Sequence, residues 1–445
     1  MKNRCRIGQI SLISLFFAVS GFGDETNAVK EAKSDGFFAT IKNLDTEFHG
    51  FVDTRVGWRT ENDPNENGRS LSEVRLQLES KTYFDWGEIN ARGDLIYDDL
   101  ATDRSKVDLE NGDGFFDLRE LNALFSPADW SDIKLGRQIL TWGTGDLLFI
   151  NDLFPKDWNS FLLGRDEEYL KAPSDAIFAS FFPSIGNFDV ALMPRMDADR
   201  YIDGRRVSYW NPMMQSIGGQ NAVIDAQRQD DWFKDGEMSL RYYRNIAEYE
   251  VALYGYHGFW KSPMGMDANG AYFPELNTYG ASVKAPLGKG LFNLEAGYYD
   301  SREHSNLAQS RFVPNDETRF LAGYEREIAK DFTASAQYYV EWMMDYDSYY
   351  NNPMVVKSTA RDEFRHVLTL RLTKMLMNQN LILSLFTFYS PSDNDAYFRP
   401  AVTYKISDNW LVNVNGNFFV GENDHTFFGQ FKHNSNLNLG FRYSF

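Results

Sequence analysis

Residues 436–445 read Asn-Leu-Asn-Leu-Gly-Phe-Arg-Tyr-Ser-Phe, and every second residue in this stretch is large and apolar. Leucine and aromatic side chains alternate with Asn, Gly, Arg and Ser. Because successive side chains of a strand point to opposite faces, this pattern predicts a strand with one apolar face and one polar face. A wall between lipid and water is built from such strands, so the stretch favours a transmembrane β-barrel. A half-buried terminal strand of a soluble sandwich is the alternative.

The aromatic residues of this stretch carry a second indication. Phe441, Tyr443 and Phe445 stand at alternate positions, and the strand resembles the C-terminal assembly signal of Gram-negative outer-membrane barrels. The resemblance implies that the barrel-assembly machinery is a partner of the chain. It also implies that this strand closes the barrel.

The first residues have the parts of a secretory signal peptide. Lys2, Arg4 and Arg6 precede an apolar run at 7–19, and Gly21-Phe22-Gly23 supplies a small-x-small cleavage site. The apolar run is too short to span a bilayer as a helix. We therefore expect three parts in the chain: a signal peptide at 1–23, a periplasmic lead-in at 24–43 and an outer-membrane β-barrel at 44–445.

The alternation recurs along the rest of the chain, for example at 332–342 and 410–418. Short connections such as 286–290 alternate with long polar ones such as 143–174, as periplasmic turns and extracellular loops do. Counting the segments gives eighteen strands. The sequence thus predicts an all-β fold: a transmembrane antiparallel up-and-down barrel of about 16–18 strands, with long extracellular loops and short periplasmic turns.

Charge and composition exclude several classes of function. The formal charge is −18, and removal of the signal peptide takes away three positive charges to leave −21, so no basic surface for nucleic acid is expected. Cys5 is the only cysteine, and the six histidines show no metal-ligand spacing. We expect no metal, no cofactor and no nucleic-acid partner.

The negative charge lies mostly in the long connections, which together carry −19. One interpretation is solubility together with divalent-cation bridges to lipopolysaccharide, which would be a partner alongside outer-membrane lipid. The other is an acidic channel mouth that favours cations.

The most individual stretch is 135–146, which reads Leu-Gly-Arg-Gln-Ile-Leu-Thr-Trp-Gly-Thr-Gly-Asp. It breaks the alternation, because Leu135 and Arg137 share a face. The Gly-Arg-Gln-x3-Trp-Gly-x2-Asp pattern, with Leu118-Arg-Glu120 before it, resembles a porin-like, alginate-export-like family of uncharacterised outer-membrane barrels. The resemblance implies a large single barrel with a transport role. Phe154 departs from the Asn more usual before the proline in that family.

This stretch and the loop after it supply the candidate site residues. Arg and Gln side chains could donate to a polar solute while Trp faces stack on it, as a sugar or an aromatic acid requires. The alternative is that the same side chains fix an inward-folded loop. The candidates for the pore constriction or for ligand contact are Arg137, Gln138, Trp142, Asp146, Asp152, Asp157 and Trp158.

Five arginines are expected to face the lumen: Arg55, Arg75, Arg92, Arg371 and Arg442. They could line a basic strip. The alternative is that they pair with carboxylates such as Asp53, Glu73, Asp94 and Glu341 to stiffen the lumen.

The loop 143–174 is expected to fold into the barrel and to set its narrowest point. It is far longer than a connection between two strands needs, and long ordered loops are usually functional. Its several Phe and Trp residues would be poorly placed in water but could pack on an inner wall. The loop 197–235 is the rival for this role.

The leading functional hypothesis is an outer-membrane channel for small polar or amphipathic solutes, without enzymatic activity. The second is an export conduit or scaffold that works with a periplasmic complex. A surface hydrolase using His433 and Ser435 is a third, because outer-membrane lipases place Ser and His on a barrel wall. A calcium loop with Asn111, Asp113 and Glu120 is a further weak candidate, since a strand and not a helix is expected after it.

Overall fold

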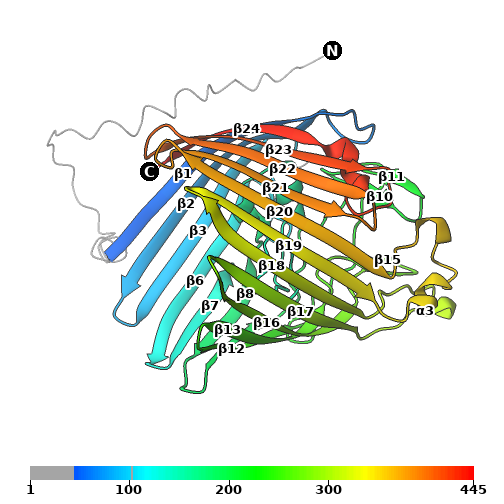
Figure 1. The fold of residues 1–445 in the computed structure, drawn as a ribbon, viewed down its shortest axis with the longest axis horizontal. Helices are drawn as coiled ribbons and strands as arrows, with labels where there is room; N and C mark the ends of the chain where they lie inside the picture. The colour runs from blue at the N-terminus through cyan, green and yellow to red at the C-terminus, as the bar shows by residue number, and fades with distance from the viewer. Residues whose placement is uncertain (1–44, 102–103) are drawn as a thin grey trace, which may run out of the picture. The chain divides into compact units, whose positions relative to one another are not determined.

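The computed structural model describes residues 45–101 and 104–445. The expected signal peptide and periplasmic lead-in lie outside the described residues. The rest forms one antiparallel sheet of eighteen strands that closes on itself. The predicted transmembrane β-barrel and the count of eighteen strands are therefore confirmed (Figure 1).

The barrel strands are, in chain order, β1 (Asp45–Arg59), β2 (Arg69–Phe84), β3 (Gly87–Asp98), β6 (Phe116–Ala128), β7 (Ser131–Gln138), β8 (Ser174–Phe181), β9 (Asn187–Met193), β12 (Glu237–Ile246), β13 (Tyr249–Phe259), β16 (Glu275–Leu287), β17 (Gly290–Ser301), β18 (Glu317–Ala329), β19 (Phe332–Met343), β20 (Phe364–Leu376), β21 (Leu381–Ser390), β22 (Asp395–Lys405), β23 (Trp410–Gly421) and β24 (Asn436–Ser444). Each strand pairs with the next, so the topology is up-and-down throughout.

β24 closes the ring by pairing with β1, from Phe51 opposite Ser444 to Arg59 opposite Asn436. Phe445 extends this seam, because its N–H donates to the Gly50 carbonyl (2.9 Å) and Gly50 N–H donates back (3.1 Å). In Figure 1, the red β24 lies beside the blue β1. The alternating stretch that indicated the fold is therefore the closing strand.

The long connections contain small elements of their own. They hold three two-stranded hairpins, β4–β5 (Val107–Asp108, Asp113–Gly114), β10–β11 (Tyr209–Asn211, Ser216–Gly218) and β14–β15 (Gly265–Asp267, Gly270–Tyr272). They also hold the helices α2 (Trp158–Leu163) and α3 (Tyr346–Tyr350) and the 3₁₀ turns η2 (Glu167–Leu170), η3 (Leu307–Gln309), η4 (Lys357–Thr359) and η5 (Gly429–Asn434). None of the helices in the described ranges is both long and apolar enough to cross a membrane.

The outer face of the wall is apolar. Leu368 and Leu370 of β20 are 45% and 41% exposed, and Phe441 of β24 is 46% exposed. Leu370 lies opposite Ala336 on β19 and Thr387 on β21 in the ladder. Apolar side chains repeated at alternate positions around a closed sheet are what contact with lipid requires.

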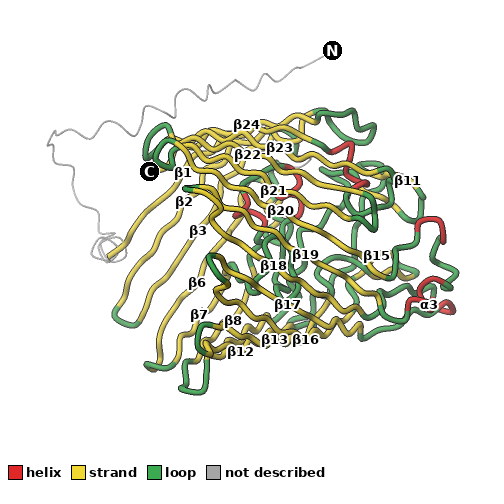
Figure 2. Tube along the Cα trace, viewed as in Figure 1, coloured by secondary structure: helices red, strands yellow, loops and turns green. Residues whose placement is uncertain are grey.

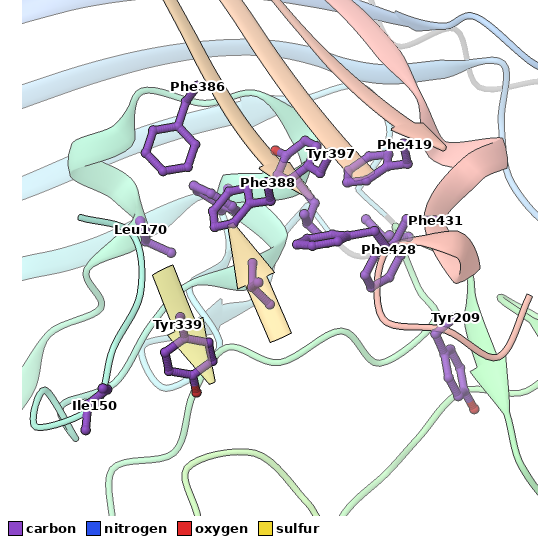
Figure 3. Close-up of a cluster of buried hydrophobic side chains, with 14 of the residues drawn as sticks. Ile150, Leu170, Tyr209, Tyr339, Phe386, Phe388, Tyr397, Phe419, Phe428 and Phe431 are labelled. Atoms are coloured by element: carbon purple, nitrogen blue, oxygen red, sulfur yellow. The ribbon is translucent and has the colours of Figure 1, made fainter. Parts of the chain in front are cut away.

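The largest apolar core lies inside the ring of strands. Phe386 and Phe388 of β21, Tyr397 of β22 and Phe419 of β23 are buried there, and Figure 3 shows them beside Phe428 and Phe431 near η5. The Tyr397 ring stacks on Phe419 with 4.3 Å between centroids. One side of the lumen is thus filled with aromatic side chains, against which an inward-folded segment can pack.

Candidate functional site: an inward-folded loop

The connection between β7 and β8, residues 139–173, lies inside the barrel. Figure 2 shows loop and short helical segments within the ring of strands. Hydrogen bonds place the segment there, because it bonds to strands as far apart around the ring as β2, β17, β20 and β24. It follows the fifth barrel strand, where the sequence predicted an inward loop.

The first attachment is a carboxylate on β17 that the loop surrounds with donors. Glu295, which is 3% exposed, accepts backbone N–H groups of Thr144 (2.7 Å), Gly145 (3.2 Å) and Asn151 (2.9 Å). It also accepts the Thr144 hydroxyl (2.9 Å) and the Asn151 amide (3.0 Å). Five donors aimed at one buried carboxylate satisfy its charge without a cation.

Two glycines on the wall let the loop approach this closely. A Cβ on Gly280 of β16 would lie 1.7 Å from Asn151 Oδ1, and one on Gly297 of β17 would lie 2.6 Å from Ile150. Ile150 is fully buried. The absence of side chains at these two positions therefore creates the seat for residues 150 and 151.

The second attachment is an ion pair across the lumen. Asp146 accepts two bonds from Arg371 of β20, at 2.6 and 2.7 Å. Its backbone N–H and carbonyl bond to Gln337 of β19, at 2.8 and 2.9 Å. A bidentate Arg–carboxylate pair fixes direction as well as distance, so the loop is held to β19 and β20 at one place.

The third attachment holds the other end of the loop to the barrel seam. Asp166 accepts from Arg55 of β1 (2.8 Å) and pairs with Arg442 of β24. Both arginines also pair with Asp53, at 3.2 and 3.1 Å. Burial alone would raise the pKa of Asp166, but the two guanidinium groups lower it below its usual value.

Neighbouring residues add further attachments. Arg165 donates to Glu73 of β2 at 3.0 and 2.6 Å, and Glu167 pairs with Arg371 (3.2 Å) and Arg399 (3.6 Å). The loop is therefore fixed on several sides of the lumen. It is held across the inside of the barrel and is not a free cap.

A short helix lies between these attachments. Asp157 caps α2 by accepting the Ser160 N–H at 2.7 Å, and Gly164 ends the helix with a left-handed φ of 90°. Phe161 projects from α2 onto Tyr397 of the aromatic cluster, with ring centroids 5.9 Å apart. The Arg399 guanidinium lies over the Phe161 ring, 3.9 Å from the ring centroid. The helix thus carries the apolar contact between loop and wall.

The loop between β9 and β12, residues 194–236, supports the first one. Asp199 accepts the Lys156 N–H (2.8 Å) and the Trp158 indole N–H (2.9 Å). Burial raises the pKa of Asp199, and these donors oppose that shift. Arg200 pairs with Asp157 (3.3 Å) and with Asp117 of β6 (2.8 Å). The predicted rival loop is therefore joined to the first loop inside the barrel.

Two cavities lie beside the inward-folded loops 139–173 and 194–236. The larger holds about 700 Å³ and is lined by Arg92, Trp142, Tyr169, Lys171, Arg241 and Lys284, among others. The smaller holds about 60 Å³ and is lined by Asp98, Asp113, Arg200 and Arg206, among others. Arg92 and Asp98 are six positions apart on β3, so the cavities lie at different heights along one wall. The buried Arg75–Asp94 pair (2.5 Å) lies on β2 and β3 between those heights.

The contacts of Arg137 and Gln138 favour the structural role over solute binding. Both are buried, at 9% and 0% exposed. Arg137 donates to the carbonyls of Leu118 (2.7 Å) and Leu109 and pairs with Asp175 (2.9 Å). Gln138 donates to backbone carbonyls, including that of Ala176 (3.0 Å). Their donors are engaged within the protein and are not offered to a solute.

The other candidates divide between wall, loop and cavity. Trp142 lines the larger cavity and packs edge-on against Phe154, 5.0 Å away. Asp152 pairs with Lys156 of its own loop at 3.0 Å, and both are buried. Of the three candidate aspartates, Asp146 alone pairs with one of the five predicted lumen arginines. Asp157 caps α2 and pairs with Arg200.

The five lumen arginines do not form a free basic strip. Every one is ion-paired in the structure: Arg55 with Asp53 and Asp166, Arg75 with Glu73 and Asp94, Arg92 with Glu79 and Glu120, Arg371 with Asp146 and Glu167, and Arg442 with Asp53 and Asp166. Three of them hold the loop through Asp146 and Asp166. Because carboxylates neutralise their positive charge, their main role is to hold the loop and the wall in position.

The weaker candidates are not assembled as sites. Ser435 is buried, donates to the Lys432 carbonyl (2.9 Å) and accepts the Phe419 N–H (3.0 Å). His433 lies 3.3 Å from Glu61 instead. Asp113 lies in the β4–β5 hairpin, and no group of metal-ligating side chains is found in the described ranges.

Sequence reasoning missed Glu295, Asp166 and the aromatic cluster. Strand β21 shows a usable signal, because Leu-Phe-Thr-Phe-Tyr at 385–389 has apolar residues on both faces. A strand that is apolar on both faces is buried on both. For Glu295 the alternation shows only that the side chain points inward.

We expect Glu295→Gln to loosen the loop without unfolding the wall. The amide loses the charge and turns one donor toward N–H groups, which should weaken the attachment by about 2–3 kcal/mol. The measurement is single-channel current noise together with the rate of proteolysis within residues 144–151.

The matched control is Glu325→Gln on β18, an exposed carboxylate one strand away, which should leave both readouts unchanged. Equal behaviour of the two variants would show that Glu295 does not hold the loop.

No family model matches this sequence, and no curated protein matches it. Solved structures do resemble the fold. Pseudomonas aeruginosa OpdO aligns with a TM-score of 0.55 at 13% identity, over 91% of this chain and 99% of that one. Acinetobacter baumannii OccAB3 aligns at 0.52 and 12%, over 90% and 99%. P. aeruginosa OccK2 in complex with glucuronate aligns at 0.52 and 11%, over 90% and 98%. The chain therefore has the fold of these porin-like outer-membrane barrels.

Proposed function

We propose that this protein is a channel of the bacterial outer membrane that passes small polar or amphipathic solutes, with residues 139–173 as its constriction. The observation that carries the proposal is the attachment of one loop to opposite sides of a closed barrel. Glu295 holds its beginning, Arg371 holds Asp146, and the seam arginines hold Asp166. A fixed constriction selects solutes by their size and by the electric field of its charged side chains.

The larger cavity indicates what the constriction contacts. Its lining combines Trp142 and Tyr169 with charged side chains, and it holds about 700 Å³. Most of these charges are paired with protein groups, so a polar solute with an apolar face fits better than a bare ion. We expect no catalysis, because His433 and Ser435 make separate contacts.

The test is reconstitution of the purified protein in liposomes and planar bilayers. We expect swelling with small sugars, amino acids and glucuronate, and stepwise single-channel currents. Glucuronate is included because a barrel of similar fold was solved with it. An inserted protein that gives neither swelling nor current would contradict the channel.

The alternatives remain distinguishable by experiment. An export conduit would give no swelling alone but would co-purify with a periplasmic complex. The alginate-export-like assignment rests on the Gly-Arg-Gln-x3-Trp-Gly-x2-Asp pattern, in which Gln138 bonds to the backbone of β8 and Asp146 holds the loop to β20. That assignment stays a prediction.

A further inference from the structure

The barrel wall is lowest at three neighbouring strands. β7, β8 and β9 have 8, 8 and 7 residues, whereas β2 has 16 and β20 has 13. A strand tilted by about 45° needs about 9–11 residues to cross the hydrocarbon region. The seven residues of β9 reach only about 16 Å at that tilt, against an apolar band about 25 Å tall.

These three strands stop early at the end of the barrel where the long loops attach. At the other end, β6 and β7 are joined by a tight turn, and residues 182–186 join β8 and β9. β7 ends where Gln138 pairs with Ser174, and β9 ends where Met193 pairs with Glu237. The two inward-folded loops begin at these ends. The wall there is continued by irregular backbone.

Side chains tie this irregular backbone together from within. Asp197 accepts the Asp175 N–H at 3.1 Å and donates its own N–H to Glu237 at 3.1 Å. Glu237 in turn pairs with Lys261 at 2.7 Å. Irregular backbone at membrane depth is tolerated only where protein covers it. Side chains must therefore cover this backbone where it faces the lipid.

Trp232 and Phe233 are placed to supply that cover. The Phe233 N–H donates to the Pro194 carbonyl (2.7 Å), immediately after β9. Phe233 is 84% exposed and Trp232 is 59% exposed, and the Arg195 guanidinium lies 5.7 Å from the Trp232 ring. Directly below, the outward side chains of Leu192 and Met238 form a cross-strand pair and are 41% and 38% exposed.

We propose that Trp232 and Phe233 extend the lipid-facing surface above β7–β9 and insert into the outer leaflet at its boundary with the headgroups. The inference rests on the outer-membrane location proposed above. Trp is favoured at membrane interfaces, where its ring is apolar and its N–H meets water. Asp231, Lys234 and Asp235 flank the pair and suit headgroups and water. An interface between copies would bring these charges together in an apolar contact.

The test is the depth of a nitroxide label in bilayers. In a Cys5→Ser background the chain has no other cysteine, so each variant carries one label. Phe233→Cys is compared with Leu240→Cys, a mid-wall outward residue 40% exposed, and with Met213→Cys, a loop-tip residue 78% exposed. Relaxation by oxygen reports lipid, and relaxation by a water-soluble nickel chelate reports water.

We expect the label at 233 to respond to oxygen as strongly as the label at 240 and to respond weakly to nickel, while the label at 213 does the reverse. A response at 233 that matches 213, with 240 in lipid, would overturn this inference and leave the channel proposal intact. A label at 240 that is in water would overturn the membrane location itself. Protection at 233 from both reagents, with dipolar broadening, would show that a second copy covers the patch and would also overturn the inference.

Discussion

Deletion of residues 147–170 should raise single-channel conductance severalfold and weaken solute selectivity. The deleted segment contains α2, whose Phe161 packs on Tyr397. It also contains Asp166, which binds the two seam arginines. The stub keeps the bonds of Thr144 to Glu295 and of Asp146 to Arg371, but it loses the segment that reaches the aromatic cluster and the seam. The measurement is conductance and ion selectivity in planar bilayers, on protein whose insertion is confirmed by heat-modifiable migration on gels.

The control for this deletion follows from the structure. The rival loop 197–235 does not supply a clean control, because its Asp199 and Arg200 hold Lys156, Asp157 and Trp158. A removal of only residues 212–215, the exposed turn between β10 and β11, avoids these contacts. It should leave conductance unchanged. Equal conductance of the 147–170 deletion and the intact channel would mean that the loop does not limit the pore.

A milder variant separates loosening from loss of the loop. Asp146→Asn with Asp166→Asn removes the charge from two attachments and leaves Glu295 in place. Flickering between conductance levels is the expected outcome. If the deletion protein fails to insert, this variant still reports whether the loop gates the lumen.

The wall could be predicted from sequence because it is a local property. Alternation at 436–445 depends on one strand and its two faces, and alternating connection lengths fix the order of neighbours. Eighteen strands follow from these two regularities. The inward loop could also be predicted, because it is longer than a connection needs to be and its aromatic side chains are poorly placed in water but can pack on an inner wall.

The contacts inside the lumen could not be predicted in the same way. Glu295 and Glu325 are both carboxylates in neighbouring strands, but only Glu295 meets the N–H groups of the loop. That choice depends on the path of residues 144–151 in space. Asp146, Asp152 and Asp157 looked equivalent along the chain, yet one binds the wall, one binds its own loop and one caps a helix. Pairing of charges across a lumen is decided by tertiary distance, which sequence spacing does not give.

The second large effect is expected at the barrel seam. Phe445→Asp should reduce the amount of barrel in the outer membrane far more than it destabilises barrel that has already folded. Phe445 is 51% exposed, so losing its ring should cost the folded wall only about 1–2 kcal/mol. Its backbone bonds to Gly50 do not depend on the side chain. The large loss is expected earlier, when β24 must be recognised and brought to β1, because an unpaired edge in lipid leaves backbone groups without partners.

Two measurements separate assembly from stability. Quantified outer-membrane levels in cells report assembly, and refolding of the urea-denatured protein into detergent reports the intrinsic stability of the barrel. We expect Phe445→Asp to be nearly absent from membranes yet to refold in detergent close to the unchanged protein. Phe427→Asp is the matched control, because Phe427 is an aromatic residue of similar exposure (49%) in the connection before β24. It should reach normal levels in cells. Normal membrane levels of the Phe445 variant would show that the aromatic ladder of β24 serves only lipid contact, and failure of both assays would place its effect in the stability of the seam.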